Sequence, residues 1–133
     1  MSPEEAIEDF LAQTSFALYG MSRGGDKFGN RVYANLTSKG YRILPVHPVA
    51  EEIGGVRCWP GLDDLPEKVD GAILVIPPPQ TEKVVRQIHA ARIGRVWMQP
   101  GAESTEAVRY CEENGISVVF QECVMVRSSP RPD

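Results

Sequence analysis

Four short apolar runs along the chain each stop at a turn that is rich in glycine, proline or other small residues. The runs cover residues 16–19, 43–44, 72–75 and 96–98. Between them lie amphipathic segments of helix length, in which apolar side chains recur every three or four residues. Strand-like runs that alternate with amphipathic helices indicate βαβ units, whose strands pair in parallel. The pattern therefore predicts an α/β fold.

The predicted elements follow this alternation. Strands are expected at about residues 15–19, 42–46, 71–76, 95–98 and 117–121. Helices are expected from Pro3 onward and at about residues 29–38, 81–92 and 105–114. Residues 50–65 are less regular, and they predict a turn at 53–56, a short edge strand at 58–59 and a helical turn at 62–65. Right-handed crossovers between the strands would give a Rossmann-like, doubly wound, mainly parallel sheet with helices on both faces.

The first helix has a recognisable beginning. Ser2 is expected as its N-cap and Pro3 as its first residue, and Glu5 completes a capping box. An apolar stripe at helical spacing follows, which predicts packing on the sheet; it consists of Ala6, Ile7, Phe10 and Leu11.

A chain of 133 residues is long enough for one domain with a single core. We expect this domain to cover residues 1–126. Residues 127–133 are polar and rich in proline, and we expect them to form a disordered tail.

Charge and cysteine content narrow the function classes. The formal net charge is −4 at pH 7, whereas nucleic-acid-binding domains are normally basic, so nucleic acid is not an expected partner. No apolar run approaches the roughly 20 residues that span a membrane, and the acidic N-terminus lacks the basic region of a secretion signal. Cys58, Cys111 and Cys123 show no paired spacing. This favours reduced thiols in the cytoplasm over disulfide bonds or a zinc site.

The turn after the first strand is a candidate phosphate site, because ligands of parallel α/β sheets bind at the carboxyl ends of the strands. Residues 20–25 read GMSRGG, with Ser22 in place of the second glycine of the dinucleotide fingerprint. Backbone N–H groups and the N-terminus of the next helix attract an anion there. Arg23 and Lys27 could add charge-assisted hydrogen bonds. The alternative is a flexible glycine loop with solvated charges.

The residues at the end of the second strand indicate which type of nucleotide cofactor the site could bind. NAD-binding folds usually carry an acidic residue there, which binds the ribose 2′-hydroxyl. This chain has Val46, His47 and Pro48 instead, with no carboxylate before Glu51. Arg42 begins the same strand. The pattern favours a ligand with an additional phosphate over NAD.

A succession of segments resembles the small bacterial and archaeal CoA-binding domain proteins. The segments are residues 20–22, 28–32, 40–48, 53–55, 65–66, 69–70 and 96–102, and the resemblance covers about residues 15–123. These proteins are similar to the CoA-binding domain of the succinyl-CoA synthetase α subunit. The resemblance implies a Rossmann-like fold that holds coenzyme A, or an acyl-CoA, across the carboxyl ends of the strands.

The resemblance also implies the cofactor-binding residues. Arg42 stands where the synthetase has a lysine that contacts CoA, and Pro77 and Pro78 match its proline-containing turn. Arg23 is a departure, because the synthetase loop has glycine at that position. The expected site comprises Gly20, Met21, Ser22, Arg23, Gly24, Lys27, Asn30, Arg42, His47, Pro48, Ile76, Pro77, Pro78, Met98, Gln99, Pro100 and Gly101.

Catalysis needs a nucleophile or base with a partner that orients it, and no such pair stands out. His47 is a candidate ligand contact, His89 an ordinary helical histidine and Cys123 a buried structural thiol. The synthetase's phosphorylated histidine belongs to a second domain outside the resemblance. We therefore expect a CoA-binding protein without catalysis of its own. The alternative is an NAD(P)-binding enzyme or redox sensor on the same fold. The sequence leaves open the acyl group, the pathway, a protein partner or homo-oligomer, and the reactivity of Cys123.

Overall fold

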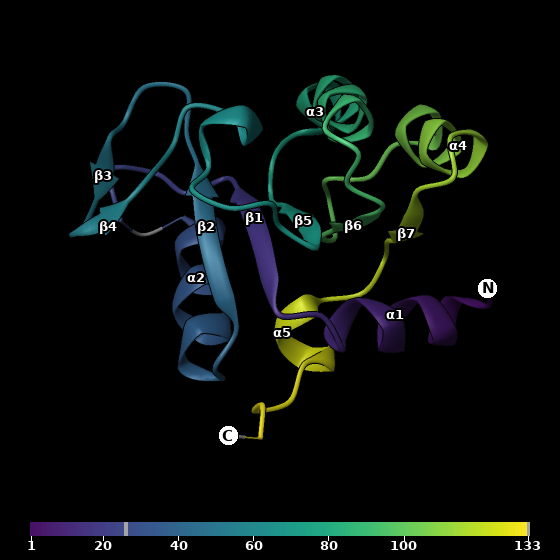
Figure 1. Cartoon of the computed structure of the whole chain (residues 1–133), viewed down its shortest axis with the longest axis horizontal. Coiled ribbons are helices and arrows are strands. Elements are labelled where there is room, and N and C mark those ends of the chain that lie inside the picture. Colours follow the sequence, from purple (N-terminus) through teal and green to yellow (C-terminus); the bar gives the residue numbers. More distant parts are fainter. Residues whose placement is uncertain (26, 133) are drawn as a thin grey trace.

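Five parallel strands form the central sheet of the computed structural model, which describes residues 1–25 and 27–132 (Figure 1). The strands are β1 (Ser15–Tyr19), β2 (Arg42–Val46), β5 (Gly71–Leu74), β6 (Arg95–Met98) and β7 (Ser117–Val119). The helices are α1 (Pro3–Leu11), α2 (Phe28–Ser38), α3 (Pro78–Ala90), α4 (Thr105–Glu113) and α5 (Val124–Arg127). A two-stranded hairpin of β3 (Glu52–Ile53) and β4 (Val56–Arg57) and a 3₁₀ turn at Leu62–Asp64 complete the described elements.

The strand order in the sheet is β2-β1-β5-β6-β7, and every neighbouring pair is parallel. From β1 the chain moves outward to β2 on one side and returns to β5 on the other side. The order therefore reverses between β1 and β5, which is the topological switch point where open α/β sheets bind their ligands. The predicted doubly wound parallel sheet is confirmed.

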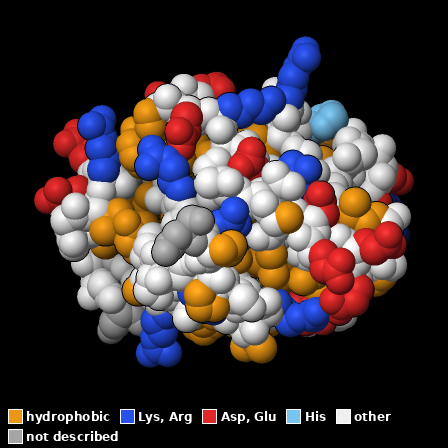
Figure 2. Space-filling model, turned by 60° about the horizontal axis from the view of Figure 1, so that its bottom comes forward, with side chains coloured by type: hydrophobic (Ala, Val, Ile, Leu, Met, Phe, Trp, Pro, Cys, Tyr) orange, Lys and Arg blue, Asp and Glu red, His pale blue; other side chains and the backbone are white. Residues whose placement is uncertain are grey.

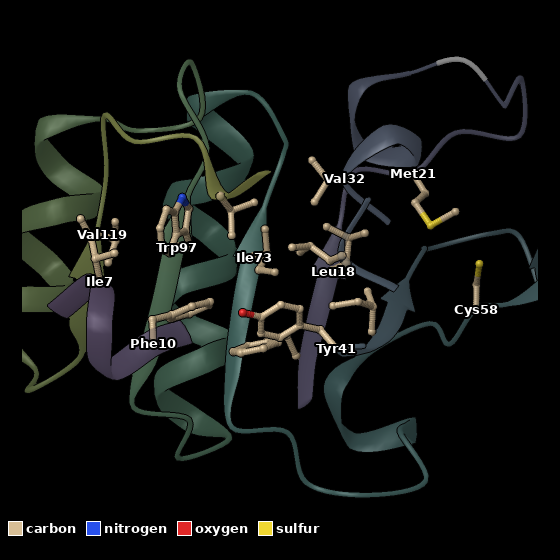
Figure 3. Packing of buried hydrophobic residues seen from close by; sticks show 14 of the residues in the cluster. Ile7, Phe10, Leu18, Met21, Val32, Tyr41, Cys58, Ile73, Trp97 and Val119 are labelled. Atoms are coloured by element: carbon tan, nitrogen blue, oxygen red, sulfur yellow. The ribbon is translucent and has the colours of Figure 1, made fainter. Parts of the chain in front are cut away.

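Helices cover both faces of the sheet, and side chains alternate between the faces along each strand. On β1, Phe16 and Leu18 belong to one buried cluster, and Ala17 and Tyr19 belong to the other. Figure 1 shows α1, α2 and α5 on one side of the sheet and α3 and α4 on the other. Figure 3 shows the first cluster, in which side chains from α1 and α2 meet those of β1, β5 and β6.

The start of α1 has the predicted capping box. Ser2 Oγ accepts a hydrogen bond from the Glu5 backbone N–H at 3.1 Å, and the Ser2 N–H donates to Glu5 Oε1 at 2.9 Å. Pro3 is the first helical residue.

Several boundaries differ by one to three residues from the sequence-based expectation, and three of these differences have a local reason. β5 ends at Leu74 rather than at residue 76, because prolines that lack an N–H group follow at positions 77–79. α3 begins at Pro78, three residues earlier than expected, since proline suits the first turn of a helix. β7 ends at Val119, because the chain turns at Gln121, whose φ is 63°.

The irregular segment after β2 folds back on that strand. The turn expected at residues 53–56 is the connection of the β3–β4 hairpin, where Gly54 and Gly55 have φ angles of 55° and 82°. Trp59 then forms a parallel bridge with Val46 at the end of β2. The expected edge strand is therefore limited to this bridge.

We expected residues 127–133 to form a disordered tail; Asp133 lies outside the described residues, and the segment 127–132 contacts the domain. The Lys39 ammonium donates to the carbonyl oxygens of Met125 and Ser128 at 2.7 and 3.2 Å. The Arg131 guanidinium donates to the Gln13 carbonyl at 2.7 Å and lies over the Tyr41 ring. These contacts join the C-terminal segment to α2 and to the start of β1.

Charges of both signs occur across the molecular face shown in Figure 2, with hydrophobic side chains exposed between them. Among the helices of the described residues, none combines the length and the apolar composition that crossing a membrane requires.

Candidate functional site

A cavity of about 460 Å³ lies at the switch point, where the carboxyl ends of β1, β2 and β5 meet the first turns of α3. Its volume is in the range of small-molecule sites. The lining residues come from β1, β2 and α3, from the segments that follow β1 and β2, and from the turn after β5: Tyr19, Gly20, Met21, Val46, His47, Pro48, Pro60, Ile76, Gln80, Lys83, Val84 and Gln87. Of the residues that the sequence predicted, the cavity therefore brings together Gly20, Met21, His47, Pro48 and Ile76.

Two glycines allow the turn after β1 to pass close to its neighbours. Gly20 has a φ of 121°, and a Cβ at this position would lie 2.1 Å from the Val75 carbonyl oxygen. Gly29, in the first turn of α2, packs on the turn so closely that a Cβ there would lie 2.3 Å from the Gly20 oxygen. The N-terminus of α2 consequently abuts the rim of the cavity.

Ser22 and Asn30 brace this turn against α2. The Ser22 N–H donates to Asn30 Oδ1 at 2.9 Å, and Asn30 Nδ2 donates to the Ser22 carbonyl at 3.1 Å. The Ser22 hydroxyl oxygen accepts from the Gly24 N–H at 3.2 Å. The sequence predicted that Ser22 and Gly24 line a phosphate loop and that Asn30 belongs to the cofactor site. In the structure their hydrogen bonds hold the loop in shape, so the Ser22 and Gly24 N–H groups are already engaged.

Positive charge and a helix N-terminus flank the braced turn. Lys27 is the N-cap of α2, and its side chain forms no capping hydrogen bond. Arg23 and Lys27 are both exposed beside the loop. An anion at this rim would be attracted by the helix dipole and by both cations.

His47 lies at the end of β2 in a defined orientation. Its Nδ1 accepts hydrogen bonds from the backbone N–H groups of Val49 and Ala50 at 3.1 and 2.9 Å. In the neutral imidazole the proton therefore lies on Nε2, which can donate to a ligand. His47, Pro48 and Pro60 also line a second cavity of about 740 Å³, formed by residues 47–52 and 57–60.

Arg42 does not belong to this site, which corrects the sequence-based expectation. It is the first residue of β2 and pairs in register with Ser15, the first residue of β1. Four residues of extended chain separate it from Val46 at the cavity, a distance of about 13 Å. Its exposed guanidinium forms an ion pair with Glu67. Arg42 therefore lies at the amino end of the sheet, opposite the cavity.

The residues at the end of β6 and in the turn after it, which we expected at the cofactor site, do not line the cavity either. Met98 and Gln99 have 0% and 1% of their surface exposed. Gln99 Oε1 accepts from the Val124 N–H at 2.6 Å, and its amide nitrogen donates to Cys123 Sγ at 3.5 Å. Met98 therefore packs in the buried core, and the buried Gln99 side chain forms hydrogen bonds to the start of α5. Pro100 and Gly101 are exposed beyond the strand and do not line the cavity.

The proline turn after β5 positions α3. Pro77 is the N-cap of α3 and is exposed, and Pro78 is the first helical residue. Neither lines the cavity, although Ile76 before them does. The proline turn thus sets where α3 begins, and one face of this helix lines the cavity.

Sequence reasoning missed the polar wall on α3. Gln80, Lys83 and Gln87 recur every three or four residues and so share one helix face, together with Val84. This spacing was readable in the sequence, but only the fold shows that the face lies over the ends of β1 and β2. Tyr19 was assigned only to a buried strand.

His47 and Cys58 both line the cavity of about 740 Å³, but His47 Nδ1 accepts from two backbone N–H groups and Cys58 Sγ lies 3.7 Å from the Val56 carbonyl oxygen. Burial raises the pKa of the Cys111 thiol to about 12, and burial together with Glu52 raises the pKa of the Cys58 thiol. His89 is exposed on α3 and meets the Tyr110 ring edge-on. Within residues 1–25 and 27–132, no three His, Cys, Asp or Glu side chains gather in a way that could hold a metal ion.

Comparison with known proteins relates this geometry to a family. A family model described as a CoA binding domain matches residues 14–129. The α subunit of acetate–CoA ligase (ADP-forming) II from Pyrococcus furiosus is 28% identical over an alignment of 138 positions, gaps included. The alignment covers 92% of this chain and 29% of the ligase subunit.

Two solved structures extend the comparison. A conserved hypothetical protein from Pyrococcus furiosus is 37% identical with a TM-score of 0.81, and the match covers 86% of this chain and 99% of that protein. The dinucleotide-forming acetyl-coenzyme A synthetase 1 of Candidatus Korarchaeum cryptofilum is 26% identical with a TM-score of 0.71, over 84% of this chain and 27% of the synthetase.

This chain thus spans less than a third of either enzyme but nearly all of the small protein. Since the family model matches most of its length, the chain belongs to the CoA binding domain family.

Proposed function

We propose that this protein binds coenzyme A or an acyl-CoA at the carboxyl ends of β1, β2 and β5, without catalysing a reaction on it. The observation that carries the proposal is the cavity of about 460 Å³ at the switch point of a CoA binding domain. The ligase and the synthetase compared above are named for reactions that involve CoA. Their similarity to this chain supports CoA as the ligand.

The charge distribution supports the same ligand. CoA carries a diphosphate, and the turn at Gly20 and Met21 lies next to the N-terminus of α2 with Arg23 and Lys27 beside it. A diphosphate would be stabilised there by the helix dipole and the two cations. β2 ends in Val46, His47 and Pro48, without the carboxylate that binds the 2′-hydroxyl of NAD.

CoA is expected to bind more tightly than NAD in calorimetric titrations of the purified protein. Arg42→Ala is the matched control: its charge lies at the far end of the sheet, so the CoA affinity should stay within about twofold of the wild-type value. NAD binding more tightly than CoA would reject the proposed ligand. A tenfold loss of CoA affinity in Arg42→Ala would reject the proposed position.

The absence of catalysis is proposed from the surroundings of the two side chains that could act as a base or a nucleophile. His47 lines the cavity, and its Nδ1 is engaged by two backbone N–H groups. Cys123, expected to be buried, is half-buried at the N-cap of α5 and does not line the cavity; its sulfur accepts from the Gln99 amide. We expect no steady hydrolysis of acetyl-CoA and no reduction of NAD(P) by the purified protein. Thioester hydrolysis that persists through purification and disappears in Cys123→Ser or His47→Ala would contradict this expectation.

A further inference from the structure

Tyr19 is the last residue of β1 and lines the cavity at the switch point. It pairs with Val46 of β2 on one side and with Leu74 of β5 on the other. Its side chain belongs to the buried cluster beneath α3, with Leu44, Val46 and Val84, and it lines the cavity of about 460 Å³.

The hydroxyl of Tyr19 is unusual for so buried a group. The residue is 8% exposed, and among the described residues its oxygen has no hydrogen-bond partner. Burial raises the pKa of Tyr19 to about 12, so the phenol remains a neutral donor throughout the physiological pH range. An unpaired buried hydroxyl is unfavourable. Phenylalanine would fill the same space without this cost, so packing alone does not account for the hydroxyl.

The other residues that line the cavity suit the adenine base and the phosphate of CoA. Val46, Ile76 and Val84 provide apolar surfaces on which a flat heteroaromatic ring can lie. The amides of Gln80 and Gln87 can both donate to and accept from the edge of an adenine base. Lys83, on the same helix face, supplies a positive charge for a phosphate.

Resting on the proposed function, we propose that Tyr19 is a ligand-binding residue whose hydroxyl donates a hydrogen bond to the adenosine 3′-phosphate half of CoA, with Lys83 facing the 3′-phosphate. The hydroxyl oxygen is covered in the structure. Gln80, Lys83 and Gln87 are exposed side chains, and such side chains change rotamer on the picosecond-to-nanosecond timescale. Under this proposal the ligand reaches the hydroxyl by displacing side chains that line the cavity.

Tyr19→Phe separates this role from a structural one, because ligand binding should weaken while the stability of the ligand-free protein should not fall. In calorimetric titration the variant should bind CoA and adenosine 3′,5′-bisphosphate about 3- to 10-fold more weakly than the wild type. The melting temperature of the ligand-free variant should be equal to that of the wild type or higher. Tyr33→Phe on α2, outside the cavity, is the matched control and should leave the CoA affinity unchanged.

Each outcome decides between explanations. If the wild type does not bind CoA, the proposed function fails. If it binds CoA and Tyr19→Phe binds equally well, the function stands and the role of Tyr19 is rejected. A Tyr19→Phe variant with a lower melting temperature would show that the hydroxyl stabilises the fold, which also overturns the proposal.

Lys83→Ala tests the orientation of the ligand. The variant should weaken CoA binding by about 5-fold and leave dephospho-CoA, which lacks the 3′-phosphate, nearly unchanged. Equal losses for the two ligands would remove Lys83 from the 3′-phosphate.

Discussion

Replacing Gly20 with alanine should cost at least about 4 kcal/mol of the free energy of unfolding, a large part of the total for a domain of this size. Two effects combine at this position. Its φ of 121° is strained for any residue with a Cβ, and the added methyl carbon would lie 2.1 Å from the Val75 carbonyl oxygen. Because Val75 is itself hydrogen-bonded to the Tyr19 carbonyl at 2.9 Å, relieving the overlap requires β1 and β5 to separate.

Urea unfolding followed by circular dichroism measures this loss, and Gly25→Ala provides the control. Gly25 has a φ of 81°, but a Cβ there would meet no atom within 4 Å. It should therefore cost only the backbone strain, about 1–2 kcal/mol. Equal losses in the two variants would contradict the close approach of β1 and β5 at the cavity.

Gly29→Ala gives a second test of the same packing. Alanine in place of a glycine within a helix normally stabilises by about 1 kcal/mol. Here the new Cβ would lie 2.3 Å from the Gly20 oxygen, so the substitution should destabilise the protein. A stabilised Gly29→Ala variant would show that α2 does not abut the turn.

Gln99→Ala should lower the free energy of unfolding by about 2–4 kcal/mol, the second largest effect that we expect. The substitution removes the acceptor of the Val124 N–H, which is fully buried, and leaves a void where a side chain with 1% exposure had been. An unpaired buried N–H costs about 1–3 kcal/mol, and the void adds to this. Gln87→Ala, at an exposed helical position, should change stability by less than about 0.5 kcal/mol.

The effect of Gln99→Ala should be concentrated at the C-terminal segment. Gln99 holds Val124, and the Trp97 indole N–H donates to the Glu122 carbonyl at 2.8 Å. Loss of the first anchor should increase hydrogen exchange at residues 122–128 before the rest of the sheet opens. Uniform exchange across the domain, or a stability equal to that of Gln87→Ala, would reject the bracing role of Gln99.

The local sequence determined where helices and strands form and that the turn after β1 is rich in glycine. Strands β1, β2 and β6 have the predicted bounds, because each short apolar run is followed within two residues by glycine or proline, which ends the strand. Ser2 and Glu5 determine the start of α1 through contacts three residues apart. Gly20 was expected in the turn after the first strand and Gly29 at the start of the next helix, and the succession of motifs was enough to identify the CoA binding domain family.

Only the tertiary structure decided which predicted side chains reach the cavity. Arg42 and His47 are five positions apart on one segment, but a parallel strand carries them to opposite ends of the sheet. Gln99 follows β6 as Gly20 follows β1, yet β6 lies away from the switch point and Gln99 turns into the core toward Val124. The packing of α3 places Lys83 over the end of β1. The cavity depends on which strand ends become neighbours, and long-range pairing between β1, β2 and β5 sets that arrangement beyond the reach of local sequence pattern.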